Sequence, residues 1–168
     1  MQSLAVIFAC MAAVSALDIR LFEGRDCKGG TFTCTNVNPN SCCGIPSGGV
    51  SSVGFYGILP QWNIECRGHE NGRCANTKTI QVAFNTNFKC LNDGPYTGGG
   101  YGFRANKARG LGLDKQTSGE QQMPDRFETA DGRKYNLAAL DTDQLVEFID
   151  QTANGTSLEA YKALEVME

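Results

Sequence analysis

The sequence predicts a mainly β, disulfide-rich sandwich followed by a small hairpin-plus-helix C-terminal tail. Of the eight cysteines in 168 residues, seven lie between residues 27 and 90. Through the same region, short stretches of alternating apolar and polar residues are separated by glycine, asparagine and proline. Such spacing is typical of an all-β sandwich or barrel. No cysteine follows residue 90, and the last part of the chain has the signals of a hairpin and two short helices instead.

The first 16 residues predict a signal peptide. Residues 4–14 are uniformly apolar, and no charged side chain precedes Asp18. The small residues of Val14–Ala16 are those that signal peptidase requires, so we expect cleavage after Ala16. The apolar run is too short to cross a bilayer, which needs about 20 residues. We therefore expect a secreted, extracellular protein without a membrane span.

Residues 17–104 form the predicted cysteine-rich β domain. Five stretches in it have the alternation expected of half-buried strands: 18–22, 31–35, 50–56, 62–66 and 79–84. The glycine-rich stretch Gly98–Phe103 comes after them. Because no Lys-Ser/Thr ending and no helix follow it, it lacks the pattern of a phosphate-binding loop, and we expect a flexible loop between strands.

The cysteines predict a covalent framework. In an oxidising compartment, seven cysteines indicate three disulfides and one unpaired thiol. Adjacent side chains point in different directions, so Cys42 and Cys43 should pair with different partners; the pairing is otherwise open. The unpaired cysteine could join two chains in a covalent dimer. The disulfide candidates are Cys27, Cys34, Cys42, Cys43, Cys66, Cys74 and Cys90.

Residues 105–125 are polar, glycine-containing and aperiodic, which predicts a flexible linker. Beyond it, residues 126–168 are expected to form a β-hairpin and an acidic helical tail. The dipeptide Asp131-Gly132 can adopt the two positive φ angles of a type I′ turn, so we expect a hairpin over 127–135.

A helix is predicted next. Asp141 and Gln144 have the spacing of a capping box, and Leu145, Phe148 and Ile149 make one apolar stripe. Asn154-Gly155 should end this helix, and a second one should begin near Ser157. The sequence Asn154-Gly155-Thr156 also makes Asn154 a glycosylation candidate.

Catalytic and metal-binding patterns are weak. Histidine-dependent hydrolysis needs a positioned imidazole, but the only histidine, His69, lies in a hydrophilic segment where we expect an exposed loop. Asp125, Glu128 and Asp131 are better explained as a solvated acidic face than as a glycosidase pair. With no paired Cys-x-x-Cys motif, a zinc site is not expected. We predict no enzyme, no catalytic residue, no metal and no other cofactor.

Charge and aromatic residues suggest the kind of partner. The formal net charge is −3, and neither half of the chain has the basic density that nucleic-acid binding needs. The segment 54–62 sets bulky residues beside turn formers, so Phe55, Tyr56 and Trp62 are binding-surface candidates for protein or carbohydrate recognition. The alternative for Phe55 and Trp62 is a place in the core.

Phe22–Gly29 resembles the βγ-crystallin Greek-key motif, in which an aromatic residue, four residues, a second aromatic, one residue and a glycine succeed each other. Cys27 takes the place of the second aromatic residue. Val50–Val53 resembles the downstream serine corner, and a shorter second copy runs from Trp62 to Ile80. The resemblance implies a sandwich in which a bent hairpin pairs with that corner. Where the family places acidic calcium ligands this chain has Ser47-Gly48, so we expect no calcium site.

The leader, the cysteine-rich region and the tail segment 130–137 together resemble small secreted cysteine-rich proteins of filamentous fungi. This resemblance implies an effector-like virulence protein that binds a host or competitor extracellular protein or a cell-wall component, without catalysis. The alternatives are an antimicrobial or killer toxin and, further, a small protease inhibitor or hydrolase. Membrane lysis normally uses cationic surfaces, so the acidic charge argues against it.

Overall fold

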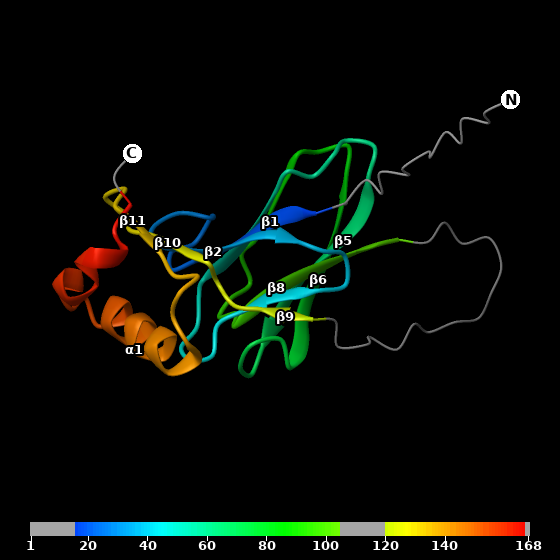
Figure 1. The fold of residues 1–168 in the computed structure, drawn as a ribbon. Coiled ribbons are helices and arrows are strands. Elements are labelled where there is room, and N and C mark those ends of the chain that lie inside the picture. Colours follow the sequence, from blue (N-terminus) through cyan, green and yellow to red (C-terminus); the bar gives the residue numbers. More distant parts are fainter. Residues whose placement is uncertain (1–15, 105–119, 167–168) are drawn as a thin grey trace, which may run out of the picture.

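The computed structural model describes residues 16–104 and 120–166, which form two facing β-sheets with two helices at one end (Figure 1). Residues 1–15 of the predicted leader, residues 105–119 of the predicted linker and the last two residues lie outside the described residues. The described elements are β1 (Leu17–Phe22), β2 (Thr31–Val37), β3 (Cys42–Gly44), β4 (Ser52–Tyr56), β5 (Asn63–Glu70), β6 (Asn76–Phe84), β7 (Phe88–Leu91), β8 (Gly98–Phe103), β9 (Gln121–Gln122), β10 (Arg126–Glu128), β11 (Lys134–Asn136), α1 (Thr142–Ala153) and the 3-10 helix η1 (Leu158–Leu164).

The two sheets repeat one topology. The first has the order β11-β10-β2-β1-β4-β7 and the second the order β6-β5-β8-β3-β9. Each half of the region 17–104 therefore gives its third strand to the sheet of the other half: β3 joins β8, and β7 joins β4. This exchange interlocks the halves and confirms the predicted disulfide-rich Greek-key sandwich.

Alternation along the strands builds the core between the sheets. Leu21, Phe32, Val53 and Ile64 are at most 2% exposed and face the core, whereas alternate residues such as Asp18 and Arg20 of β1 point to the outer face and are only partly buried. All five predicted strands are confirmed, with boundaries that differ by a few residues. The short strands β3, β7 and β9 were not predicted, because two to four residues are too few to show a period.

The prediction of a flexible loop at Gly98–Phe103 was wrong, because this stretch is β8, an interior strand of the second sheet. Its glycines are needed for close packing. A Cβ atom on Gly98 would lie 2.6 Å from the Arg73 carbonyl oxygen, and one on Gly99 would lie 2.6 Å from a methyl group of Val53. The glycines that indicate flexibility in the sequence thus allow other segments to approach the strand on both of its faces.

A bent hairpin connects β1 to β2 and folds back onto β4. The Ser52 hydroxyl, which is completely buried, donates to the Gly24 carbonyl at 2.6 Å and accepts the Cys27 N–H at 3.0 Å. Cys27 has φ 54°, so the turn is held in the left-handed region by these bonds. This hairpin-to-serine contact is the one that the Greek-key resemblance implies; the resemblance to βγ-crystallins itself stays a prediction.

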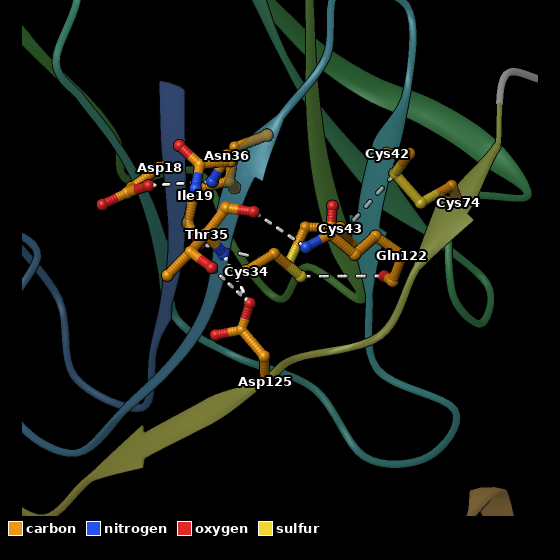
Figure 2. The surroundings of a disulfide bond; sticks show 10 residues. All are labelled: Asp18, Ile19, Cys34, Thr35, Asn36, Cys42, Cys43, Cys74, Gln122 and Asp125. Carbon is orange, nitrogen blue, oxygen red and sulfur yellow. Dashed lines mark hydrogen bonds between the residues drawn. A yellow bond between two sulfur atoms is a disulfide. The ribbon is translucent and has the colours of Figure 1, made fainter. Parts of the chain in front are cut away.

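Three disulfides are present and one described cysteine is free, as predicted. The pairs are Cys27–Cys90, Cys34–Cys43 and Cys42–Cys74, and the free residue is Cys66. The neighbours in β3 do pair with different partners, one within the sandwich core and one toward the β5–β6 turn (Figure 2). Cys34–Cys43 therefore joins strands of opposite sheets, and the other two disulfides each join a strand to a turn.

Residues 120–166, here named the C-terminal segment, are integrated into both sheets. β9 pairs in parallel with β3 in the second sheet, and β10 pairs with β2 to extend the first sheet (Figure 1). Residues 120–125, which were assigned to a linker, therefore contribute a strand. Their polarity reflects exposure, because Glu120 and Gln121 lie at the surface while their backbone takes part in pairing.

The helices of this segment largely follow the prediction. Asp141 and Gln144 form the capping box of α1, and its buried residues are Leu145, Phe148 and Ile149. The second helix, capped by Ser157, begins at Leu158 but is a 3-10 helix. The type I′ turn was wrong: of the two turn residues only Gly132 has positive φ, because the loop is closed from Thr129 instead. Within the described residues, no helix has the length and apolarity needed to cross a bilayer.

Candidate functional site

The outer face of the six-stranded sheet presents one continuous row of side chains. Arg126 lies opposite Thr33, Thr33 opposite Arg20, and Arg20 opposite Gly54 in the registers of four neighbouring strands. Directly paired residues point to the same face of a sheet. Polar side chains from the C-terminal segment and from the sandwich therefore line one surface, on the side away from the core.

Aromatic rings gather at the β4–β7 end of this face. We name Phe22, Tyr56 and Phe88 the aromatic platform. The ring centroids of Tyr56 and Phe88 are 4.7 Å apart, and those of Phe22 and Tyr56 are 6.5 Å apart. Phe22 is 6% exposed and supports the platform from below, whereas Phe88 is 36% exposed and Tyr56 is partly exposed. The exposed surface is therefore an aromatic pair resting on a third ring.

Gly54 gives the rings their place on the sheet. A Cβ atom at this position would lie 2.8 Å from the Tyr56 ring, 3.0 Å from the Phe22 ring and 3.3 Å from the Cys27 sulfur. Any side chain would push the rings away from the strand. The glycine before Phe55 and Tyr56 in the sequence thus lets a ring lie over the backbone of β4.

Arg20 stacks on the platform. Its guanidinium carbon lies 4.4 Å from the centroid of the Tyr56 ring, a cation–π contact. Burial raises the pKa of the Tyr56 hydroxyl, and the nearby Arg20 charge partly lowers it. Among the described residues Arg20 forms no ion pair, and its buried Nε has no hydrogen-bond partner. The charge of Arg20 is therefore not neutralised by a carboxylate.

Covalent and polar bonds hold the platform rigid. The disulfide Cys27–Cys90 ties the bent hairpin beside Phe22 to β7, which carries Phe88. The backbone N–H of Asp26 donates to the Asn92 side chain at 2.7 Å just beyond β7. A ligand that binds here meets side chains that are already ordered, so little conformational entropy is lost on binding.

A polar groove occupies the other end of the same face. It encloses about 460 Å³ and is lined by Thr35, Asp125, Arg126, Lys134, Asn136, Ala138 and Val166. Asp125 accepts hydrogen bonds from the backbone N–H and from the hydroxyl of Thr35, as Figure 2 shows. The groove offers hydrogen-bond donors and acceptors side by side on a floor of paired strands.

The three predicted binding-surface residues do not lie together. Phe55 is 0% exposed and belongs to the core, which is the alternative that the sequence left open. Tyr56, its neighbour on the strand, points outward to the platform. Trp62 precedes β5 in the second sheet and makes an edge contact with Phe103 at 5.1 Å. The glycosylation candidate Asn154 is exposed at the end of α1.

His69 and Cys66 are buried in β5, on the opposite sheet. The expectation of an exposed loop histidine was wrong, because His69 is 2% exposed next to a bulge in the strand. Burial and the Arg67 charge lower its pKa, and its Nδ1 has no hydrogen-bond partner among the described residues. Cys66 is completely buried, and burial raises its pKa to about 12. Neither side chain is accessible to a partner or a substrate.

No pattern in the sequence indicated Arg20, Phe88 or the groove as parts of a site. Arg20 occupies the polar phase of an alternating strand, which is the ordinary place for a solvated side chain. Phe88 lies in a strand of only four residues. Cross-strand pairing brings these residues together: β4 lies next to β1, β7 joins β4 from the other half of the sequence, and β10 and β11 extend the same sheet.

A model of the ARB_05566_N family, described as an N-terminal domain, matches residues 18–127 of this chain. No curated protein and no solved structure matches it. The match includes all residues of the aromatic platform, together with Thr35, Asp125 and Arg126 of the groove. It ends inside β10, so β11 and the helices lie beyond it.

Proposed function

The chain belongs to the ARB_05566_N family, and from that premise we propose that it is an extracellular binding protein that acts without catalysis. Its binding site is the outer face of the six-stranded sheet. The target is a host or competitor component outside the producing cell, either a protein or part of a cell wall, which makes the chain effector-like. The observation that carries this proposal is the exposed Tyr56–Phe88 pair with Arg20 stacked on it.

Extracellular action is supported by the leader and by the disulfides. Disulfides persist in oxidising compartments and are rare in the cytosol. Six of the described cysteines form three disulfides here. Together with the apolar stretch at residues 4–14, these pairs favour export of the chain.

A binding role is supported by the chemistry of the outer face. An arginine beside partly exposed aromatic rings is the composition typical of binding hot spots. The described histidine is buried away from this face. Two carboxylates on the face are engaged by backbone groups, since Asp125 accepts the Thr35 N–H at 2.9 Å and Asp18 accepts the Asn36 N–H at 3.0 Å. This arrangement favours recognition over acid–base chemistry.

The test is retention of extracellular material by the oxidised mature protein. Host extracellular fluid and cell-wall fragments are passed over immobilised wild type, Tyr56→Ala and Arg20→Ala. The matched control is Ile80→Ala, which removes a 57% exposed apolar side chain from β6 of the other sheet. Loss of a hot-spot side chain weakens binding about tenfold or more, so we expect both platform variants to lose retention and the control to keep it.

The contrary result is equally clear. If Ile80→Ala abolishes retention while Tyr56→Ala binds as wild type does, the site lies on the second sheet. Retention of the same material by reduced and alkylated protein would show that no folded surface is involved. Near-ultraviolet circular dichroism on each variant reports whether the fold is intact.

A further inference from the structure

Opposite charges on the outer face are balanced. Its cations are Arg20, Arg126 and Lys134, and its anions are Asp18, Asp125 and Glu128. Glu128 and Lys134 lie directly opposite each other on neighbouring strands. A surface with this balance has no net field that would select a strongly charged ligand.

Donors and acceptors alternate in the polar groove. Arg126 can only donate and the Asp125 carboxylate can only accept, while Thr35 and Asn136 can do both. Arg126 and Asn136 are directly paired and both exposed. Sugar hydroxyl groups both donate and accept, so a polyhydroxylated ligand can satisfy such a surface without carrying charge.

The aromatic platform supplies the apolar part of the same surface. A sugar ring has one or two faces made of C–H groups, which pack on aromatic faces. Tyr56 and Phe88 are both partly exposed, and the Arg20 guanidinium stacks on the Tyr56 ring. The planes of the two rings are inclined at 46° to each other, so the pair is not a flat stack.

The geometry points to a neutral glycan chain as the ligand of this face, laid across the strands from the polar groove to the aromatic platform. The inference rests on the proposed function and names the class of ligand for that same site. From β11 to β7 the sheet has five strand spacings of about 4.8 Å each, or about 24 Å in all. That length suits an oligosaccharide and exceeds a single sugar. Between Arg126 of the groove and the platform, Thr33 and then Arg20 follow on neighbouring strands, and both arginines can donate to hydroxyl groups of the ligand.

The experiment measures binding of the oxidised mature protein to insoluble neutral polysaccharides, namely β-1,4-glucan, β-1,3-glucan and chitin. Polygalacturonate is the anionic probe, and each assay is run at low and at high salt. The variants are Tyr56→Ala at the platform, Arg126→Ala at the exposed groove and Ile80→Ala as the control on the other sheet. Arg126 is exposed and makes no described ion pair, so its replacement should leave the fold intact even if Tyr56→Ala does not fold.

We expect binding to at least one neutral polysaccharide. Tyr56→Ala and Arg126→Ala should each weaken it about tenfold, Ile80→Ala should leave it unchanged, and salt should have little effect because no counterions are displaced. Binding to polygalacturonate alone, with strong salt dependence, overturns the neutral class. Weakening by only one of the two variants overturns a ligand that spans the face.

The two proposals fail separately. Tyr56-dependent retention of extracellular proteins, without binding to any neutral polysaccharide, overturns the glycan inference and leaves the proposed binding function standing. Absence of Tyr56-dependent binding to both polysaccharides and extracellular material overturns both.

Discussion

Covalent bonds fasten the sandwich of residues 17–104, whereas the C-terminal segment has no cysteine and is held by strand pairing and apolar contacts. In the sandwich, Cys27–Cys90 connects the two halves of the sequence and Cys34–Cys43 connects the two sheets. In the C-terminal segment, β10 pairs with β2 over three residues. Segments are thus attached to the small core by disulfides in the sandwich and by strand pairing and apolar contacts in the C-terminal segment.

An aromatic cluster takes the place of disulfides in the C-terminal segment. Phe148 of α1 is completely buried and contacts four rings from other elements. Its centroid lies 5.4 Å from that of Phe127, 5.8 Å from Tyr135 and 4.8 Å from Tyr161, and Phe32 of β2 completes the cluster at 6.4 Å. This one side chain therefore joins α1, η1, the hairpin and the sandwich.

The difference bears on the binding face, because the face takes its aromatic platform from the braced sandwich and most of its polar groove from the segment without braces. Cys27–Cys90 sits beside the platform, while Lys134 and Asn136 of the groove depend on the docking of β11. The two ends of one site should therefore respond differently to reduction and to core mutation.

The largest effect is expected from reduction. The closed loops span sequence separations of 63, 32 and 9 residues, for which chain entropy predicts stabilisation of about 4, 4 and 3 kcal/mol. Their combined loss is comparable to the whole stability of a typical domain, about 5–15 kcal/mol. We expect reductant to unfold the sandwich at room temperature, as measured by near-ultraviolet circular dichroism. A reduced chain that keeps its spectrum would mean that apolar packing alone holds both regions.

The next effect should separate the two regions. Phe148→Ala empties the centre of the aromatic cluster, and such a change costs about 3–5 kcal/mol. We expect the C-terminal segment to detach while the disulfide-braced sandwich stays folded. Hydrogen exchange should then show loss of protection in α1 and β11 and unchanged protection in β5 and β8. Glycan binding that depends on the groove should fall, whereas platform contacts persist.

The matched control for this variant is Val146→Ala, on the partly exposed side of α1. It shortens an apolar side chain outside the aromatic cluster and should leave the segment docked. Loss of protection throughout the sandwich in Phe148→Ala would contradict the separation, since the segment would then be part of one cooperative unit.

These regions also differ in how far their structure could be predicted. Local signals were sufficient for α1, because the capping box of Asp141 and Gln144 and the stripe ending at Ile149 lie within one helix. They were sufficient for the longer strands too, because a period of two shows over five residues or more. The count of three disulfides and the divergence of Cys42 and Cys43 followed from chemistry alone.

The predictions that failed concern features that depend on contacts between residues distant in sequence. The glycines of β8 indicate a loop until the segments that pack against them are known, and His69 is polar in a polar stretch although the sandwich buries it. For the candidate site, Tyr56 was predicted from the bulky residues and turn formers of the segment 54–62. Arg20 and Phe88 were not, because their place beside Tyr56 depends on the pairing of β1 and β7 with β4, and β7 comes from the other half of the sequence.

The thiol of Cys66 is free, although it lies in the sandwich that the three disulfides brace. Burial raises the pKa of Cys66 from 9.0 to about 12, so its thiolate fraction near neutral pH is about a thousandfold lower than that of an unperturbed thiol. We expect no reaction of the oxidised native protein with a thiol reagent and one reactive thiol in denaturant. Electrophoresis without reductant should show only monomer; a covalent dimer would contradict the buried position.

A smaller effect is expected at the start of α1. Asp141 accepts the Gln144 N–H at 2.9 Å, and the Gln144 side chain accepts the Asp141 N–H in return. Removing an N-cap side chain costs about 1 kcal/mol, so Asp141→Ala should lower the stability of the C-terminal segment by that amount. Asp141→Asn, which keeps the acceptor, is the control. Thermal unfolding should show a small shift for the first variant and almost none for the second.

The smallest effect concerns His69 in the sandwich and the response to acid. Burial, followed by the charge of Arg67, lowers the pKa of His69, and the main chain of Asn76 only partly offsets this. Protonation of His69 is therefore disfavoured in the folded protein, whereas the same side chain in the unfolded chain binds a proton below a pH of about 6.5. Stability should fall as the pH drops through that value, and this component should be absent in His69→Gln.

Asp131 of the C-terminal segment does not interfere, because the hydrogen bond from Thr129 lowers its pKa and it titrates in more acidic solution. Urea unfolding of wild type and variant at pH 7.5 and 5.5 measures the difference. If acid destabilises wild type and His69→Gln equally, the group responsible for the acid sensitivity is not His69. The acid response would then no longer be a property of the sandwich.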